Sequence, residues 1–268
     1  MSTGHAASAI ASGDSPDVAI ARWMDLYGGR IYALALRTCG NPQDAEDVVQ
    51  ETFLQAFRKW DQFRGRSAPS TWLYTIASRI CKRRLRRRAG QPKRIGSLDE
   101  LLPFTEPAVA EIPGQAPDPA DAQIRREGRE RIEAGIAALP AGFRLPLLLK
   151  DIMNVSIAEV AGILGLKPAT VKSRIHRGRL RLRQALTKAF PRRKMGPSAY
   201  SRRVCLDLLR AKQEALDRGV AFPLPSEIVC QRCKTVFATL ELTRNICQDL
   251  AEGDLPAELR RLILERTQ

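Results

Sequence analysis

Residues 44–54 read Asp-Ala-Glu-Asp-Val-Val-Gln-Glu-Thr-Phe-Leu, and this stretch decides the fold of the first part of the chain. Residues 41–44, Asn-Pro-Gln-Asp, have the composition of a helix start, since carboxylates in a first turn complement the helix dipole. Apolar residues then recur at three- and four-residue spacing: Val49, Thr52, Phe53, Ala56, Phe57 and Trp60. This period predicts an amphipathic helix with one buried face.

A second set of side chains recurs at the same spacing on another face of that helix. It consists of Asp47, Gln50, Glu51 and Leu54. One interpretation is an ordinary solvated surface. The other is a docking surface for a partner protein, because Leu54 adds an apolar side chain to an acidic face.

The next predicted helix starts near Ser70 or Thr71, either of which can cap it, and becomes strongly basic. Nine Lys or Arg and no acid lie between Arg79 and Arg94. Such a run repels itself unless a polyanion lies against it. Four aromatic residues upstream suit stacking with unpaired bases beside a phosphate path, although Trp60 and Trp72 also fit a core: Trp60, Phe63, Trp72 and Tyr74.

The composition favours a polyanionic partner. The formal net charge is +15 and the pI is about 10.1. No apolar run reaches roughly 18 residues, so no membrane-spanning helix and no stable membrane insertion are expected. Residues 1–17 have no basic start and no apolar core, which predicts a disordered leader rather than a signal peptide, and a cytoplasmic protein.

The chain divides into helical segments joined by a linker. Residues 18–90 form the first segment, in which the pair Gly28-Gly29 predicts a break between helices. Residues 91–124, acidic and rich in proline, predict a flexible linker. Helical periodicity returns over 125–190 and again over 197–268. No stretch predicts a sheet, so the expected fold is all-α, with two small helical domains and a helical extension.

Residues 156–178 predict a helix-turn-helix. Gly165 supplies the turn, and Pro168 suits the first turn of the second helix. On that helix Val171, Ile175 and Gly178 face inward. The remaining side chains are left to meet a major groove: Thr170, Lys172, Ser173, Arg174, His176 and Arg177. Ten Lys or Arg and no acid lie between Thr170 and Lys194.

Both blocks resemble conserved regions of extracytoplasmic-function sigma factors. The first carries residues 44–54, Phe63-Arg-Gly65 and Trp72-Leu-Tyr-Thr-Ile-Ala77, like region two, and the helix-turn-helix is similar to region four. The resemblance implies promoter-specific initiation with core RNA polymerase, no enzymatic activity and no required cofactor. Its implied partners are promoter DNA, the β′ clamp helices, the β flap and an anti-sigma factor.

The resemblance also implies roles for particular residues. Asp47, Gln50, Glu51 and Leu54 would bind the clamp helices, and the groove residues of the second block would recognise the −35 element. Recognition of the −10 element would fall to Phe63, Arg64, Trp72, Tyr74, Arg79, Lys82, Arg83 and Arg86. Arg79 and Arg83 stand where the family usually carries Asn and Asp, which leaves the −10 bases unassigned.

The extension holds four of the six cysteines. Cys230 and Cys233, with Cys205 upstream, could supply part of a zinc site. Cys247 is too far along an unbroken helix to share that ion. The extension weakly resembles the zinc-binding domain of anti-sigma factors, with Ser226 at the position of the expected His. Buried cysteines, a zinc site and a reversible disulfide remain three interpretations, and a metal- or redox-sensing regulatory domain is the hypothesis.

Two other functions compete with the sigma-factor interpretation. An ordinary regulator that uses only the helix-turn-helix leaves residues 44–77 unexplained. A nucleic-acid-modifying hydrolase fits poorly, because the chain has only two histidines and no glycine-rich phosphate loop.

Overall fold

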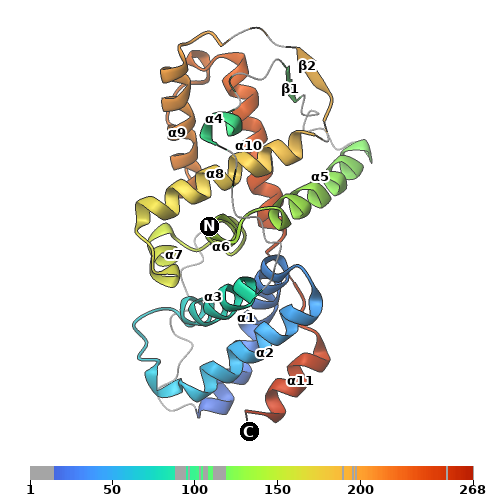
Figure 1. The fold of residues 1–268 in the computed structure, drawn as a ribbon, viewed down its shortest axis with the longest axis vertical. Helices are drawn as coiled ribbons and strands as arrows, with labels where there is room; N and C mark the ends of the chain where they lie inside the picture. Colours follow the sequence, from blue (N-terminus) through green and yellow to red (C-terminus); the bar gives the residue numbers. More distant parts are fainter. Residues whose placement is uncertain are drawn as a thin grey trace. The chain divides into compact units, whose positions relative to one another are not determined.

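The computed structural model describes residues 15–87, 95, 97–102, 104, 108–110, 119–188, 190–194, 196, 198–251 and 253–267. The predicted leader at 1–14 and much of the predicted linker lie outside these residues. The chain divides into two compact units. Unit 1 comprises residues 1–91, 158–168 and 250–268, and unit 2 comprises residues 92–157 and 169–249. The predicted all-α fold is confirmed, and Figure 1 shows its helices.

Unit 1 is built on three packed helices, α1 (Pro16–Cys39), α2 (Pro42–Arg58) and α3 (Pro69–Arg87). The helix start predicted for α2 is present, because the Asn41 side chain accepts a hydrogen bond from the Asp44 amide at 2.8 Å. Most of the predicted apolar stripe is buried, with Phe57 and Trp60 only partly covered. A short 3₁₀ turn, η1 (Trp60–Gln62), follows α2. Helices α7 (Ile157–Leu164) and α11 (Ala257–Glu265) complete the elements grouped with this unit.

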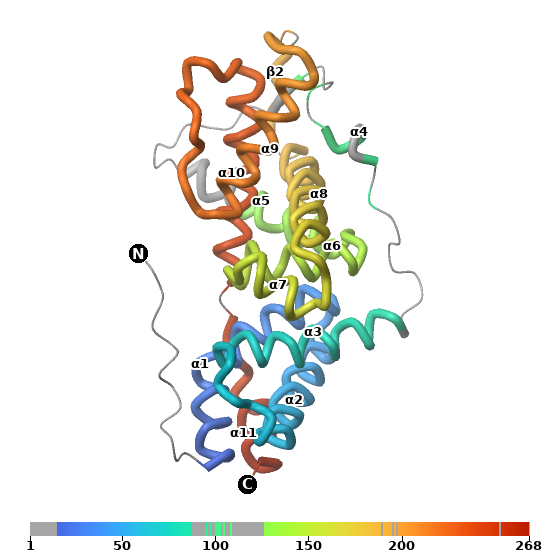
Figure 2. Tube along the Cα trace, turned by 90° about the vertical axis from the view of Figure 1, so that its left-hand side faces the viewer, coloured from blue at the N-terminus to red at the C-terminus, as the bar shows by residue number. Residues whose placement is uncertain are grey.

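The break predicted at Gly28-Gly29 is wrong, because α1 runs through this pair without interruption. The two glycines instead allow residues near the end of the chain to cross close to α1. A Cβ at Gly29 would lie 1.9 Å from the carbonyl oxygen of Gly253, and one at Gly28 would lie 2.7 Å from Leu255 Cδ2. Beyond this crossing, α11 lies beside α1 and α2 (Figure 2) and buries Leu259 and Ile263.

Unit 2 combines the middle of the chain with most of the extension. Its helices include α5 (Pro119–Ala137), α6 (Ala141–Leu147), the π-helical turn η2 (Leu148–Ile152) and α8 (Pro168–Thr187). The extension contributes α9 (Arg202–Arg218), the 3₁₀ turn η3 (Ser226–Ile228) and α10 (Gln231–Asp249). Within this unit α10 packs on α5, α9 and η2.

The stretch predicted as a flexible linker contains regular structure in its described part. Helix α4 covers Leu98–Leu101, and α5 already begins at Pro119. Strand β1 (Ala108–Ala110) pairs antiparallel with β2 (Arg192–Lys194), with Val109 opposite Arg193. The expectation of no sheet is therefore wrong for this small ribbon. Its pairing joins residues far apart in sequence, which local patterns do not report.

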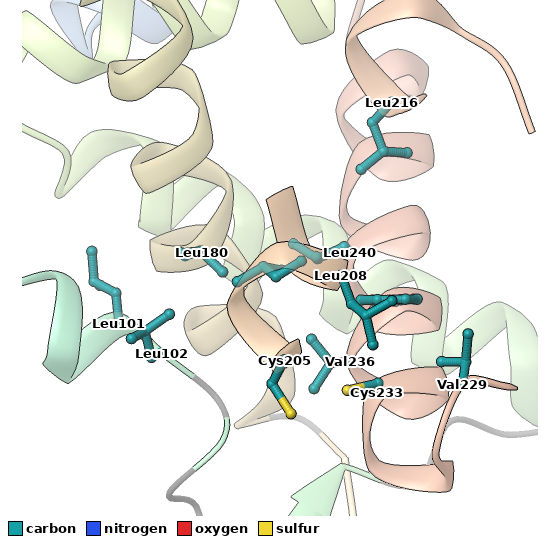
Figure 3. Close-up of a cluster of buried hydrophobic side chains, with 12 residues drawn as sticks. Leu101, Leu102, Leu180, Cys205, Leu208, Leu216, Val229, Cys233, Val236 and Leu240 are labelled. Atoms are coloured by element: carbon teal, nitrogen blue, oxygen red, sulfur yellow. The ribbon is translucent and has the colours of Figure 1, made fainter. Parts of the chain in front are cut away.

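The core of unit 2 joins the extension to α8. Leu180 of α8 packs with apolar residues of α9 and α10 in one cluster, which also takes in Leu101 at the end of α4 and Leu102 after it (Figure 3). Its members from the extension are Cys205, Leu208, Leu209, Leu216, Val229, Cys233, Val236, Phe237 and Leu240. Helices α9 and α10 are thus structural parts of unit 2.

Gly29→Ala should destabilise unit 1, because the new methyl group meets a backbone oxygen that cannot rotate away. Overpacking of this kind costs about 1–3 kcal/mol. Gly162→Ala in α7 is the matched control, since nothing lies within 4 Å of its Cβ position. The control should gain about 0.5–1 kcal/mol of helix stability. Denaturant unfolding measures the stability of both variants, and proteolysis tests the protection of residues beyond 249. Equal gains in stability in the two variants would contradict the close crossing.

Candidate functional site

The side chains predicted to bind polymerase gather on one face of α2. Asp47, Gln50, Glu51 and Leu54 line a single pocket of about 300 Å³. Gln55 and Arg58 of the same helix and Arg84 of α3 complete its lining. The structure therefore places all four predicted residues together, with Leu54 partly exposed among polar groups. This arrangement offers an acidic surface with an apolar centre.

The basic half of α3 contacts this acidic face directly. Arg84 donates from Nη1 to Asp44 Oδ1 at 2.8 Å and from Nη2 to Asp47 Oδ2 at 3.1 Å. Arg83 forms an ion pair with Glu51. Arg83 was predicted to contact DNA, but in this structure its guanidinium pairs with Glu51 on the acidic face of α2. These pairs are partly exposed, so their chief effect is to hold side-chain positions rather than to add stability.

An aromatic cluster forms beside the start of α3. Trp23 of α1 lies at its centre, 5.0 Å from Trp60, 5.1 Å from Phe63 and 6.1 Å from Trp72 between ring centroids. Trp23 was not predicted from the sequence, although its position on an apolar stripe of α1 was a usable signal. The prediction that Tyr74 contacts the −10 element is wrong, because Tyr74 is only 2% exposed and cannot reach a base from the core.

The other predicted −10 residues differ in accessibility. Arg64, Arg79 and Arg86 are exposed, whereas Phe63 and Trp72 are partly buried in the aromatic cluster. Lys82 donates from Nζ to the carbonyl oxygen of Leu164 at 3.0 Å. Three exposed guanidinium groups thus remain accessible along this face of unit 1.

The local features predicted for the helix-turn-helix are present. Gly165 has a φ of +66°, which suits glycine, and α8 begins at Pro168. Val171 and Ile175 are buried, and a Cβ at Gly178 would lie 2.7 Å from Leu147 Cδ1. Lys172 and Ser173 are exposed. The other four groove residues, Thr170, Arg174, His176 and Arg177, are partly covered.

Two arginines in the basic run of α8 belong to the core rather than to a DNA surface. Arg179 and Arg183 are 1% and 0% exposed. Arg179 binds Asp151 of η2 at 2.6 and 2.8 Å and Asp217 of α9 at 2.7 Å. Arg183 donates from Nε to Thr239 Oγ1 at 3.0 Å. Although burial alone lowers the pKa of Arg179, the two carboxylates raise it above its ordinary value.

Asp217 also contacts a predicted groove residue. His176 Nε2 lies 2.8 Å from Asp217 Oδ2, and only 4% of the Asp217 side chain is exposed. Burial raises the pKa of Asp217, but its bonds to His176 and Arg179 outweigh this and lower it overall. Asp151, Arg179 and Asp217 were not predicted from the sequence. Arg179 lies four residues after Ile175, which was the available signal.

Three predicted metal ligands of the extension do lie together. Cys205 Sγ is 2.8 Å from Ser198 Oγ, and Cys233 has thiol contacts with both Cys205 and Cys230. Figure 3 shows Cys205 and Cys233 directed into the space between α9 and α10. Within the described part of the chain, however, no group of three or more His, Cys, Asp or Glu side chains is arranged to hold a metal ion.

The thiol cluster, defined as Cys205, Cys230, Cys233 and Ser198, contains two different thiol environments. Burial raises the pKa of Cys230, but hydrogen bonds from the amides of Cys233 and Ala199 lower it overall. Burial and the neighbouring thiols raise the pKa of Cys233. A partly exposed thiol with a lowered pKa thus lies beside a buried thiol with a raised pKa.

Comparison with known proteins shows which family the chain belongs to. Residues 23–91 match Sigma-70 region 2, and residues 129–182 match Sigma-70, region 4. The chain is 36% identical over 170 residues to the ECF RNA polymerase sigma factor SigW of Bacillus subtilis, covering 63% of this chain and 89% of SigW. The chain belongs to the extracytoplasmic-function sigma factor family.

Other sigma factors are also similar to the chain. This sigma factor is 37% identical over 186 residues to SigE of Mycolicibacterium smegmatis, which covers 66% of each chain. Among solved structures, it is similar to the sigma factor RpoE, solved with the anti-sigma factor NepR from Bartonella quintana. That match has 26% identity and a TM-score of 0.44, and it covers 62% of this chain and 94% of that one.

The family places the chain in transcription initiation with RNA polymerase and promoter DNA. Both matched regions end before α9, so the extension lies outside them. The predicted likeness of the extension to an anti-sigma zinc domain has no support from these comparisons. In the described residues, no helix is long and apolar enough to cross a membrane.

Arg179→Met should strongly destabilise unit 2, because it leaves the buried carboxylates of Asp151 and Asp217 without their shared cation. Removing one partner of a buried charge pair costs about 3–5 kcal/mol. Arg181→Met is the control, since Arg181 is exposed and bonds only weakly to Gln184. Urea unfolding of both variants checks this. A change below about 1 kcal/mol in Arg179→Met would show that the network does not support the fold.

Proposed function

We propose that this sigma factor divides initiation between its two units. The acidic face of α2, made by Asp47, Gln50, Glu51 and Leu54, binds the β′ clamp helices of core polymerase. The basic side of α3 contacts the −10 element, and α8 contacts the −35 element. The protein acts as a cytoplasmic, non-enzymatic factor, with the β flap and an anti-sigma factor among its partners.

The observation that carries this proposal is the convergence of the four α2 residues on one pocket. Residues of an ordinary solvated surface are not expected to line one pocket together with a partly exposed leucine. Charged residues are depleted at interface cores, so Leu54 is the best candidate for a desolvated anchor. The surrounding carboxylates would steer a basic partner surface toward it.

The proposed −10 contact uses fewer residues than were predicted from the sequence. Arg64, Arg79 and Arg86 are exposed and can neutralise phosphates. Phe63 and Trp72 pack together at 5.0 Å between ring centroids and could form the wall of a base pocket. Tyr74, Lys82 and Arg83 are left out. Tyr74 is buried, Lys82 donates to the Leu164 carbonyl oxygen and Arg83 pairs with Glu51.

Leu54→Ala should weaken binding to core polymerase at least tenfold, the loss expected when truncation of an anchor removes about 1.4 kcal/mol or more. Gln43→Ala, an exposed change in the first turn of α2, should leave affinity unchanged. Titration of labelled core polymerase, followed by promoter-dependent transcription, checks both. If Leu54→Ala binds as tightly as Gln43→Ala, the docking surface lies elsewhere.

A second function is proposed for the thiol cluster. Cys230 and Cys233 form a thiol–disulfide pair that reacts with small-molecule disulfides, and this deepens the hypothesis of a redox-sensing extension. Cys230 is the partly exposed member and directly precedes α10, where its carbonyl accepts the first helical bond from Lys234 at 3.0 Å. A cysteine at a helix start is suited to attack, because the helix dipole stabilises its thiolate.

The exchange proceeds in two balanced steps. The Cys230 thiolate attacks one sulfur of the small disulfide, forms a mixed disulfide and releases one thiolate. Cys233 then loses its proton to solvent and attacks Cys230 Sγ, which releases the second thiolate. Two electrons pass from the protein thiols to the small disulfide. The product is a Cys230–Cys233 bond.

With Ellman's reagent, the native protein should release two coloured thiolates per reactive pair and retain no adduct. Cys233→Ser should release one and retain a mixed disulfide on Cys230, and Cys230→Ser should react slowly. Cys247→Ser is the control in the same helix and should behave as the native protein, because Cys247 is buried. Mass spectrometry distinguishes these outcomes. A retained adduct on native protein, or metal content that depends on Cys230, would contradict the disulfide pair.

A further inference from the structure

The extension lies against the helix that is proposed to recognise the −35 element. Within unit 2, one side of α9 presents three polar residues to α8. Asp217 contacts His176 at 2.8 Å, and Glu214 Oε1 lies 3.8 Å from Lys172 Nζ. Gln213 donates from Nε2 to the His176 carbonyl oxygen at 3.3 Å. Two of the six predicted groove side chains are therefore engaged by acidic groups of the same chain.

These contacts differ in strength. The His176 side chain is 18% exposed and Asp217 is 4% exposed, so water is largely excluded between them. Asp217 is held in place by Arg179, which bonds its other carboxylate oxygen. The Lys172–Glu214 pair is 46% and 43% exposed, so it contributes mainly charge. Asp217 is the anchor of the contact, and Glu214 extends its negative field toward the exposed end of α8.

The acidic groups and DNA would compete for the same atoms of α8. A major groove and its phosphates require Lys172 and His176 to face the duplex, with their cationic or donor atoms available. With Asp217 on His176 and Glu214 beside Lys172, those atoms face carboxylates instead. The two carboxylates would also repel any phosphate brought near this side of α8.

We infer that α9 is an internal competitor of promoter DNA, which covers part of the groove surface of α8 through Asp217 and Glu214. This inference rests on the proposed −35 role of α8. For DNA to bind the groove surface of α8, α9 must separate from His176 and Lys172, and DNA must supply replacement partners for these side chains. The contact is intramolecular, so even a weak pair acts at high effective concentration. The affinity for DNA therefore depends both on the groove residues of α8 and on how strongly α9 covers them.

Glu214→Gln/Asp217→Asn should raise the affinity of the full chain for a random-sequence 30-base-pair duplex about tenfold, with a steeper salt dependence. Both amides keep the size of the native side chains, and the new amide oxygen on α9 can still accept a bond from Arg179. Asp207→Asn is the control on α9 and matches the charge change of Glu214→Gln alone, since Asp207 is 62% exposed and pairs only with Arg210 among the described ion pairs. Fluorescence anisotropy at several salt concentrations measures all three proteins.

Two further variants separate the possible failures. Glu214→Gln alone, at a half-exposed position, should give part of the gain without touching the buried network. Adding Arg174→Ala to the double variant should remove the gain if α8 carries the DNA contact. Loss of the gain only in that triple variant supports the inference.

Other results would overturn it. Equal affinities for the double variant and Asp207→Asn would show that α9 is no competitor, while a loss of binding on Lys172→Ala would still support the −35 role. A gain that persists with Arg174→Ala would place the DNA contact outside α8. Weaker DNA binding by the double variant would make α9 a scaffold that α8 needs.

Discussion

The buried guanidinium of Arg179 is the constraint on which unit 2 depends. It is 1% exposed and binds carboxylates from two other elements, Asp151 of η2 and Asp217 of α9. A buried ion is tolerated only when partners satisfy it, so η2, α8 and α9 must meet in one register. The hydrophobic cluster around Leu180 gives the extension its attraction to α8, and the ion network gives it orientation. The position of α9 beside His176 follows from this register.

Local sequence patterns predicted the helices well because each pattern lies within one helix. The stripe of α2, the Asn41 start and the Gly165 turn all depend on neighbours a few residues away, and all are present. The pocket of α2 was also predictable, since one helical face brings its four residues together. Charge runs were less informative. Arg179 and Arg183 belong to the basic run over Thr170–Lys194, but their spacing from Ile175 places them on the buried stripe of α8.

The misses share a cause, which is that they depend on contacts between distant residues. Glycine lowers helix propensity, so Gly28-Gly29 predicts a break when only local terms are considered. Its actual role is to admit the backbone at Gly253, more than two hundred residues later. The β1–β2 ribbon and the cover of His176 by Asp217 are equally non-local. Tyr74 was misassigned for a related reason, because an aromatic side chain near basic residues can belong to a core or to an interface.

The carboxylates of the extension matter because of where they lie, which the composition of the chain does not show. The whole chain is strongly basic, and the run over Thr170–Lys194 contains no acid, so a nearby carboxylate must come from another segment. Asp217 and Glu214 supply it from α9. A purely structural partner for α8 could cover Leu180 with apolar residues and leave the groove side open. The carboxylates lie instead on His176 and Lys172, where they would oppose phosphate binding. The same chain therefore carries both the proposed −35 surface and two carboxylates that would compete with phosphate for it.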